Sequence, residues 1–303
     1  MADTPVLISV DWGTSSFRAY LVDAAGEALD TIPEGQGALT LQAGEHEPYL
    51  SATLGPWRAA HPDLPILASG MVGARQGWRE AAYVACPAGA DEIAAATLVV
   101  PTAALCSVRL LPGVSYVDAR GAPDVMRGEE TQILGAGGDG MFVLPGTHSK
   151  WAWVENGRIL SFATYMTGEL FAVLKAHSVL GRMMAAPGEA TSGPGFAKGL
   201  EAAQALEHPG DLMHAAFFAR SYGLFGLMEG AELADFLSGL LIGAEILAGA
   251  RGVKAATVIA SANLTRRYTE AGARLGVALT PAPANAATLG QIEVARRLGV
   301  LKG

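Results

Sequence analysis

The chain opens with alternating blocks of apolar and polar positions that predict two strands joined by a tight turn. Residues 5–10 (PVLISV) form an apolar run, and the positions after Ser16 alternate between apolar and polar as in a half-buried strand. The turn between them reads DWGTSSFR. A P-loop would need G-x-x-x-x-G-K-[ST] before a helix, and the sequence does not contain that motif. A hairpin with glycine and hydroxyl groups at its tip is therefore expected.

A second copy of this pattern lies in residues 142–160 (FVLPGTHSKWAWVENGRIL). The copies are offset by 133 positions, which matches Gly13 with Gly146, Thr14 with Thr147 and Ser16 with Ser149. Each continues through a second strand, a polar turn and a third strand. The repeat predicts two related domains, residues 1–135 and 136–303, with the last helix at 285–303 returning to the first. The two Gly-Thr turns would then line a cleft between the domains.

The second half of the chain alternates helical and strand patterns, which is typical of helices packed on a mixed sheet. The predicted helices span 169–184, 212–228, 231–250, 263–276 and 286–299, and the predicted strands span 255–261 and 277–283. Gly135, Gly137 and Gly140 spell G-x-G-x-x-G, but a strand follows them instead of a helix. They are therefore expected to form a loop and not a dinucleotide site.

Composition narrows the class of protein. Of the 303 residues, 50% are hydrophobic and 17% charged, which favours a globular chain, and a net charge of −8 argues against a nucleic-acid surface. The most apolar stretch, 212–250, is interrupted by charged residues, so no membrane span is expected. The N-terminus lacks the features of a signal peptide. We expect a soluble, cytoplasmic protein, and the sequence leaves open whether it forms a homodimer.

The two Gly-Thr turns are suited to binding phosphate. Glycine lets a ligand approach the backbone closely, successive backbone N–H groups form a concave anion site, and hydroxyl groups add donors. The candidate phosphate residues are Gly13, Thr14, Ser15 and Ser16 in the first turn and Gly146, Thr147, His148 and Ser149 in the second. Asp11, at the end of the first strand, is the candidate ligand for Mg²⁺.

Five segments carry a resemblance to a known family. They read VDWGTSSFRAYLVD, SGMVGARQGW, MRGEETQILGA, LPGTHSKWAWV and YMTGELFAVL. In this order they resemble the 2-keto-3-deoxygalactonate kinases of the actin–hexokinase–Hsp70 superfamily. The resemblance implies an α/β, two-domain ribonuclease-H-like fold with mixed sheets flanked by helices and an active site in the interdomain cleft. It also implies phosphorylation of the C6 hydroxyl of the sugar acid, dependent on ATP and Mg²⁺.

The resemblance also assigns nucleotide contacts. The two turns would hold the β- and γ-phosphates, and Ser261, Ala262 and Leu264 would meet adenosine. The chain departs from the superfamily twice: Pro145 stands where the second turn usually has aspartate, and Ala260 and Ser261 replace the usual two glycines. Asp11 is left as the better anchor for the metal.

Phosphoryl transfer needs positioning, charge stabilisation and one group that accepts the hydroxyl proton. By resemblance, Glu129 in GEETQIL stands at the position of the general base, where a helix N-terminus favours a carboxylate. Glu130 and Asp11 stay open as alternatives. A second interpretation is that both glutamates only serve the helix N-terminus.

The candidate substrate residues are Arg75, Gln76, Trp78, Arg127 and Thr167. Arginine suits a carboxylate, glutamine can bind hydroxyls, and tryptophan offers a flat face. Alternatively, Arg75 is a solvated charge and Trp78 a core residue. Two other functions stay open: a kinase of another sugar or sugar acid, and a nucleotide-binding regulator without activity.

Overall fold

The computed structural model describes residues 4–185 and 193–301 of the chain, which forms two compact units. Unit 1 comprises Met1–Asp139, Val154–Ser161 and Pro283–Gly303, and unit 2 comprises Gly140–Trp153 and Phe162–Ala282. The C-terminal segment thus belongs to unit 1. Whether one unit serves the substrate and the other the nucleotide stays a prediction.

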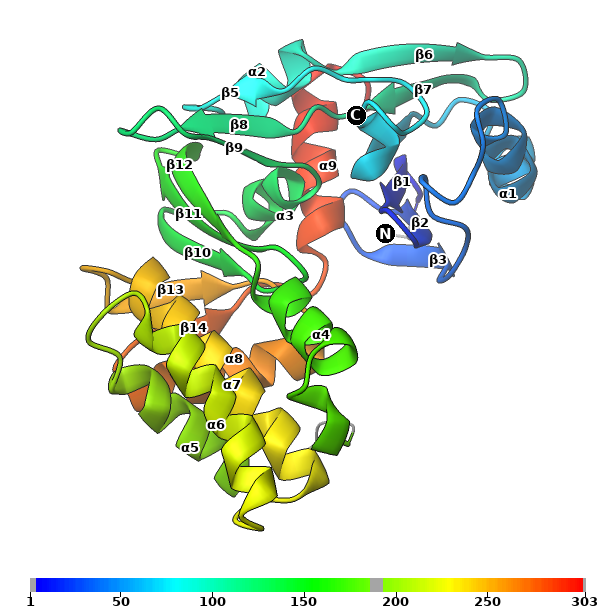
Figure 1. Ribbon diagram of the computed structural model, residues 1–303. Coiled ribbons are helices and arrows are strands. Elements are labelled where there is room, and N and C mark those ends of the chain that lie inside the picture. Colours follow the sequence, from blue (N-terminus) through cyan, green and yellow to red (C-terminus); the bar gives the residue numbers. More distant parts are fainter. Residues whose placement is uncertain (1–3, 186–192, 302–303) are drawn as a thin grey trace. The chain divides into compact units, whose positions relative to one another are not determined.

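The main sheet of unit 1 contains six strands in the order β3-β2-β1-β4-β7-β6 (Figure 1). Their bounds are Leu7–Trp12 (β1), Phe17–Val22 (β2), Ala28–Ile32 (β3), Ile66–Ser69 (β4), Leu98–Thr102 (β6) and Cys106–Leu110 (β7). Strand β1 is antiparallel to β2 and parallel to β4, and β4 is parallel to β7. The predicted hairpin is confirmed, and the turn after Asp11 lies at the carboxyl end of β1.

The main sheet of unit 2 repeats this arrangement with the order β12-β11-β10-β13-β14. Its strands are Gly140–Leu144 (β10), Ser149–Glu155 (β11), Arg158–Tyr165 (β12), Ala255–Val258 (β13) and Ala278–Pro281 (β14). Strand β10 is parallel to β13, and β13 is parallel to β14. Because β3-β2-β1-β4-β7 and β12-β11-β10-β13-β14 share one order, the repeat in the sequence corresponds to a repeated sheet.

Unit 1 also has a small sheet, β5-β8-β9, formed by Val84–Ala85, Val114–Val117 and Pro123–Met126. Its helices are His46–Ala60 (α1), Ala90–Ala95 (α2), Glu129–Ala136 (α3) and Ala286–Arg297 (α9), with a 3-10 helix at Met71–Gly73. Helix α9 lies directly against α3 (Figure 1). A β-carbon on Gly135 would come within 1.7 Å of the Ala286 carbonyl, and one on Gly290 within 1.8 Å of the Thr131 carbonyl. These glycines let the two backbones touch.

That packing corrects one expectation. The loop predicted for residues 135–140 is wrong at its start, because Gly135 lies in the last turn of α3 and packs on α9, and at its end, because Gly140 is the first residue of β10. Loop-like backbone begins at Gly137, which has φ of 66° and ends the helix.

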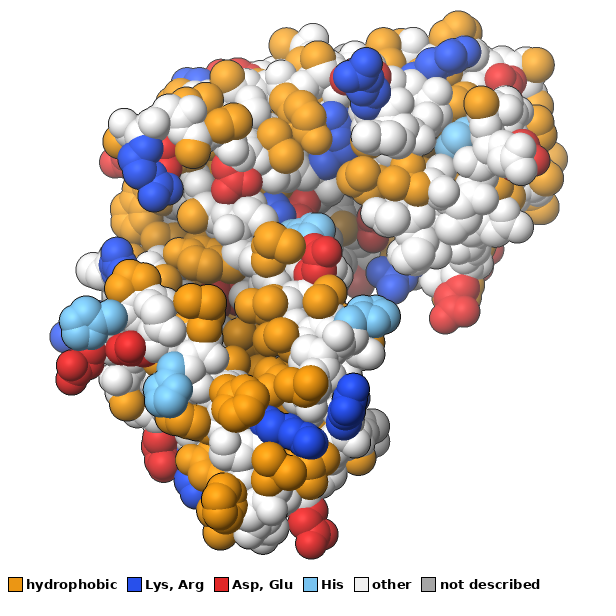
Figure 2. Space-filling view, viewed as in Figure 1, with side chains coloured by type: hydrophobic (Ala, Val, Ile, Leu, Met, Phe, Trp, Pro, Cys, Tyr) orange, Lys and Arg blue, Asp and Glu red, His pale blue; other side chains and the backbone are white. Residues whose placement is uncertain are grey.

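The helices of unit 2 are Thr167–His177 (α4), Pro194–Gln204 (α5), Asp211–Leu224 (α6), Gly230–Gly249 (α7) and Ala262–Leu275 (α8). Figure 2 shows hydrophobic side chains gathered on the surface of the helical part of this unit. The four most exposed of the large hydrophobic residues of this unit belong to α6 and the turn that follows it: Met213, Leu224, Phe225 and Leu227. Among the described residues, no helix combines the length and apolar character needed to cross a membrane.

Candidate active site

Two glycines bring Asp11 and Glu129 together in unit 1. Gly70 follows β4 with φ of 95°, and a β-carbon on it would lie 3.6 Å from Oδ1 of Asp11. Gly128 precedes α3 with φ of 105°, and a β-carbon on it would lie 3.4 Å from the Cα of Gly70. Both φ values lie in the region that glycine adopts without steric cost. The end of β1 and the start of α3 therefore meet with no side chain between them.

The charge of Glu129 acts on Asp11. Burial raises the pKa of Asp11; the Arg18 guanidinium, 3.9 Å away, opposes the rise, and the Glu129 carboxylate adds to it. Glu129 accepts the backbone N–H of Arg127 at 3.0 Å, so its side chain folds back over the start of α3. Two partly exposed carboxylates whose charges act on each other form a site that attracts a cation.

Glu130 differs sharply from Glu129, although it is the next residue. Its side chain is fully buried and accepts hydrogen bonds from the Gly128 backbone N–H at 2.7 Å and the Thr131 hydroxyl at 3.0 Å. Burial, together with the neighbouring Glu129 charge, raises the pKa of Glu130 to about 8. At neutral pH Glu130 is therefore an uncharged group that holds the helix start, and it is not exposed to a substrate.

Backbone hydrogen bonds hold the first Gly-Thr turn, and its hydroxyl groups are exposed to solvent. Gly13 donates to the Ser16 carbonyl at 2.9 Å, and the loop after β3 covers the turn through bonds from Ala38 to Gly13 and from Leu39 to Thr14. Thr14, Ser15 and Ser16 are exposed. The backbone is thus fixed while the predicted phosphate donors stay accessible.

The second turn, in unit 2, is held by the start of α4. Glu169 donates its backbone N–H to the Thr147 carbonyl at 3.0 Å, and its carboxylate lies 2.5 Å from Nε2 of His148. A β-carbon on Gly168 would come within 2.4 Å of the Gly146 carbonyl, so only glycine permits this contact. The sequence motif YMTGEL therefore supports the turn, a role that the sequence analysis did not foresee.

Ser149 differs from its counterpart in the first turn. Its hydroxyl is fully buried and donates to Oε1 of Glu245 at 2.6 Å. The same carboxylate accepts bonds from Trp151 at 2.9 Å and from the Tyr268 hydroxyl at 2.7 Å. Three donors on β11 and α8 thus converge on one buried carboxylate of α7. This network was not predicted, because Glu245 lies in an apolar helix and is 96 residues from Ser149 in the sequence.

A cavity of about 630 Å³ in unit 2 adjoins the second turn. Its walls come from the turn, α4, α7 and α8, and include Gly146, Thr167, Ala262, Leu264 and Tyr268. Candidate nucleotide residues from both motifs thus line one cavity, and Thr167 lies among them although the sequence placed it with the substrate. Ser261 stands exposed at the position before α8. A pocket of this size, with Phe171, Leu241 and Leu264 in its lining and the second turn at its edge, suits a nucleoside phosphate.

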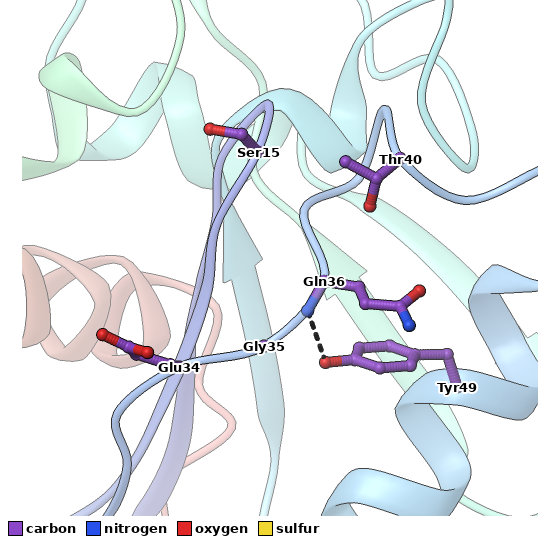
Figure 3. A pocket seen from close by; sticks show the side chains of 6 residues that line it. All are labelled: Ser15, Glu34, Gly35, Gln36, Thr40 and Tyr49. Atoms are coloured by element: carbon purple, nitrogen blue, oxygen red, sulfur yellow. Dashed lines mark hydrogen bonds between the residues drawn. The ribbon is translucent and has the colours of Figure 1, made fainter.

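Unit 1 contains an open pocket of about 680 Å³ beside the first turn. Figure 3 shows Ser15 and Thr40 at one side, and Gln36 above the ring of Tyr49 from α1, with the Gln36 backbone N–H donating to the Tyr49 hydroxyl at 2.9 Å. Glu34 and Gly35 complete the lining, which contains hydroxyls, an amide and a carboxylate. This chemistry suits a molecule rich in hydroxyl groups, and the sequence analysis had not singled out residues 34–40.

The remaining candidate residues also belong to unit 1. Arg75 and Gln76 are exposed, whereas Trp78 is half-buried and packs on the core of the unit. Arg127 is buried between the Ala81 carbonyl and the Tyr83 ring. The arrangement thus favours the core interpretation for Trp78 and leaves two arginines of very different exposure for an anionic substrate.

The donor set at Asp11 fits Mg²⁺. No group of three or more His, Cys, Asp or Glu suited to a metal occurs among residues 4–185 and 193–301. Mg²⁺ does not need one, because it is commonly bound through one or two carboxylates, waters and substrate phosphates. Asp11, with one-third of its side chain exposed and Glu129 beside it, matches that chemistry.

The repeated sheets, the paired turns and the carboxylates define an α/β fold of the actin–hexokinase type, and comparison with known proteins gives the family. The chain belongs to the 2-keto-3-deoxy-galactonokinase family, whose sequence model matches residues 11–294. Members of this family are carbohydrate kinases. The resemblance drawn from the five motifs is thereby confirmed.

Individual relatives agree with this assignment. The chain is 37% identical to a Rhizobium meliloti (strain 1021) protein named "Probable 2-dehydro-3-deoxygalactonokinase DgoK1", over 95% of this chain and 96% of that one. It is 33% identical to the 2-dehydro-3-deoxygalactonokinase of Escherichia coli (strain K12), over 90% and 91%. A crystal structure from Sinorhizobium meliloti, titled as the same kind of kinase, superposes with a TM-score of 0.85 at 34% identity, over 96% of this chain and 98% of that chain.

Proposed function

We propose that the protein transfers the γ-phosphate of ATP to the C6 hydroxyl of 2-keto-3-deoxygalactonate. The adjacency of Asp11 and Glu129 carries the proposal, because a kinase needs a metal-binding carboxylate and a proton acceptor within reach of the same phosphate. Family membership supports the choice of substrate.

In this mechanism Glu129 accepts the proton of the C6 hydroxyl as that oxygen attacks phosphorus. Glu129 is partly exposed and its carboxylate is held over the start of α3, whereas Glu130 is covered and protonated at neutral pH. Asp11 would hold Mg²⁺, which neutralises charge on the phosphates when it is bound. Thr14, Ser15 and Ser16 supply hydroxyl donors to phosphate oxygens.

The nucleotide would occupy the cavity of unit 2. Its apolar side chains from α4, α7 and α8 suit adenosine, and Gly146 at its edge, followed by the exposed Thr147, would meet the phosphates. Ser149 contributes through its backbone only, because its hydroxyl is buried against Glu245. Thr167 serves this cavity in our assignment, and Arg75 and Gln76 stay candidates for the sugar acid.

The decisive experiment couples ADP release to a panel of acceptors with MgATP: 2-keto-3-deoxygalactonate, its C4 epimer, neutral hexoses and no acceptor. We expect ADP release with 2-keto-3-deoxygalactonate and little ADP release without an acceptor. Preferential phosphorylation of a neutral hexose would instead favour a kinase of another sugar. Nucleotide binding without turnover of any acceptor would favour a regulator.

A further inference from the structure

The Arg127 guanidinium is buried without an anion. The side chain is only 9% exposed, Nη2 donates to the Ala81 carbonyl at 2.8 Å, and the guanidinium carbon lies 4.3 Å above the Tyr83 ring. Nε and Nη1 have no hydrogen-bond partner in the described part of the chain. There is also no ion pair to this arginine among those residues.

Such an arrangement is costly unless a ligand completes it. Burial of a charged group without a counter-charge is unfavourable, and each unmet buried donor adds to that penalty. A cation–π contact offsets only part of it and satisfies no donor. An anion with acceptor oxygens would supply both the counter-charge and the acceptors.

The surroundings are shaped for this guanidinium. A β-carbon on Gly73 would stand 2.9 Å from Nη1, so the position tolerates no larger residue without displacing the arginine. Gly73 belongs to the glycine-punctuated segment SGMVGARQGW. Nε and Nη1 are covered in this structure, so an anion can reach them only if residues 69–78 change conformation.

Arg127 contacts the candidate base at its backbone and carries the buried charge at the far end of its side chain. The backbone N–H of Arg127 bonds the Glu129 carboxylate, while its side chain runs to Ala81 and Tyr83. One residue thus connects the proton acceptor with a buried cation. In a 2-keto-3-deoxy sugar acid the C1 carboxylate and the C6 hydroxyl stand at opposite ends of one carbon chain, so such a substrate has one group for the cation and one for the proton acceptor.

We propose that Arg127, and not Arg75, binds the C1 carboxylate of the substrate, an inference that rests on the proposed function. Arg75 is exposed, so water screens its charge and its interaction with an anion is weak. Arg127 is held in a low-dielectric setting, where a charge-assisted bond to a carboxylate is stronger and more selective.

The test compares the sugar acid with its C1 carboxamide, which has the same shape without the charge. In the wild-type enzyme kcat/KM should favour the acid by about 10- to 100-fold, the scale of a hydrogen bond between charged groups. Arg127→Gln should bring that ratio close to one, while KM for ATP changes little. The matched control, Arg75→Gln, should retain the wild-type ratio. An unchanged ratio in Arg127→Gln, or its collapse in Arg75→Gln, overturns the assignment.

A purely structural arginine would lower activity toward both acceptors equally and leave the ratio intact. If Arg127→Gln does not fold, Gly73→Ala provides the second measurement, because its methyl group crowds Nη1 while the charge stays. Its acid-to-amide ratio should fall as well, and an unchanged ratio contradicts the proposal. A wild-type enzyme that phosphorylates neither acceptor contradicts the proposed function instead, and calorimetric binding of acid and amide to the same variants then decides the role of Arg127.

Discussion

Gly70 and Gly128 lie against each other, with 3.4 Å between the Cα of Gly70 and the place of a β-carbon on Gly128. This contact brings the loop after β4 to the start of α3, and with it Asp11 to Glu129. The separation of the candidate metal ligand from the candidate base is therefore set by two residues without side chains.

Substitution of Gly70 should disturb both the fold and the site. Gly70→Ala places a methyl group 2.8 Å from the Trp12 carbonyl at a φ of 95°, so we expect a loss of about 1–3 kcal/mol in unfolding free energy. Urea titration measures it. Gly44→Ala, also at positive φ but with open space around it, is the control for backbone strain alone. An equal loss in both variants would show that the contact with Trp12 is unimportant.

Asp11→Asn should reduce turnover by orders of magnitude, because an amide is a much poorer ligand for Mg²⁺ than a carboxylate. Stability should not fall, since burial and Glu129 both disfavour the charged form of Asp11. Steady-state kinetics across Mg²⁺ concentrations and thermal melts check both statements. Near-normal turnover of the variant at low Mg²⁺ concentration would show that Asp11 is not a ligand of Mg²⁺.

Glu129→Gln should lower kcat about 10²–10⁴-fold, the usual effect of removing a positioned base. KM for both substrates should change little, because the interaction matters mainly in the transition state. If the variant is active, Glu129 is not the general base, and Asp11 becomes the first alternative. The melting temperature should stay close to that of the wild type.

Glu130→Gln should reveal a pH-dependent stability. The folded pKa of about 8 lies above the ordinary value of 4.5, so the folded state binds more protons between these pH values. The stability of the wild type therefore falls as pH rises from about 4.5 to 8. The glutamine variant should lack this slope and exceed the wild type in stability at pH 9. Denaturation curves of both proteins at pH 5 and 9 measure this. If the stability difference between wild type and variant is the same at both pH values, the pKa of Glu130 is not raised by burial.

Ser149→Ala should affect stability more than catalysis. It removes one of three donors to the buried Glu245 carboxylate, whose Oε1 keeps the bond from Trp151, so we expect the loss of one hydrogen bond, about 0.5–1.5 kcal/mol. KM for ATP should change less than it does in Thr147→Ala, whose hydroxyl is exposed beside the nucleotide cavity. A normal melt with a large increase in KM for ATP would instead give the Ser149 hydroxyl a direct role in binding phosphate.

Local patterns in the sequence predicted the two hairpins and most elements of the second half, because these segments carry a clear periodicity; the elements between β3 and α3, and helix α5, were not predicted. The match of Gly13 with Gly146 already indicated the repeated sheet, and Gly276, with φ of 77°, ends α8 as expected. The position of Glu129 at the first residue of α3 was also predicted from the motif.

Contacts between distant segments could not be foreseen in the same way. Glu245 is a single acidic residue in an apolar helix, and only the fold brings three donors to it. Burial of Glu130 depends on packing around the start of α3, although the sequence Glu-Glu looks symmetric. The buried state of Arg127 likewise depends on Ala81 and Tyr83, which carry no recognisable motif.

The close contact of α3 with α9 has a consequence for biosynthesis. The helix that carries Glu129 is supported by residues of Pro283–Gly303, and most of unit 2 is encoded between them. Domains usually fold from the N-terminus as the ribosome releases the chain. Unit 1 cannot do so here, because its supporting helix leaves the ribosome after unit 2. A chain stalled before α9 would thus present Glu129 on an unsupported helix, and kinase activity would appear only once α9 has been synthesised and has packed on α3.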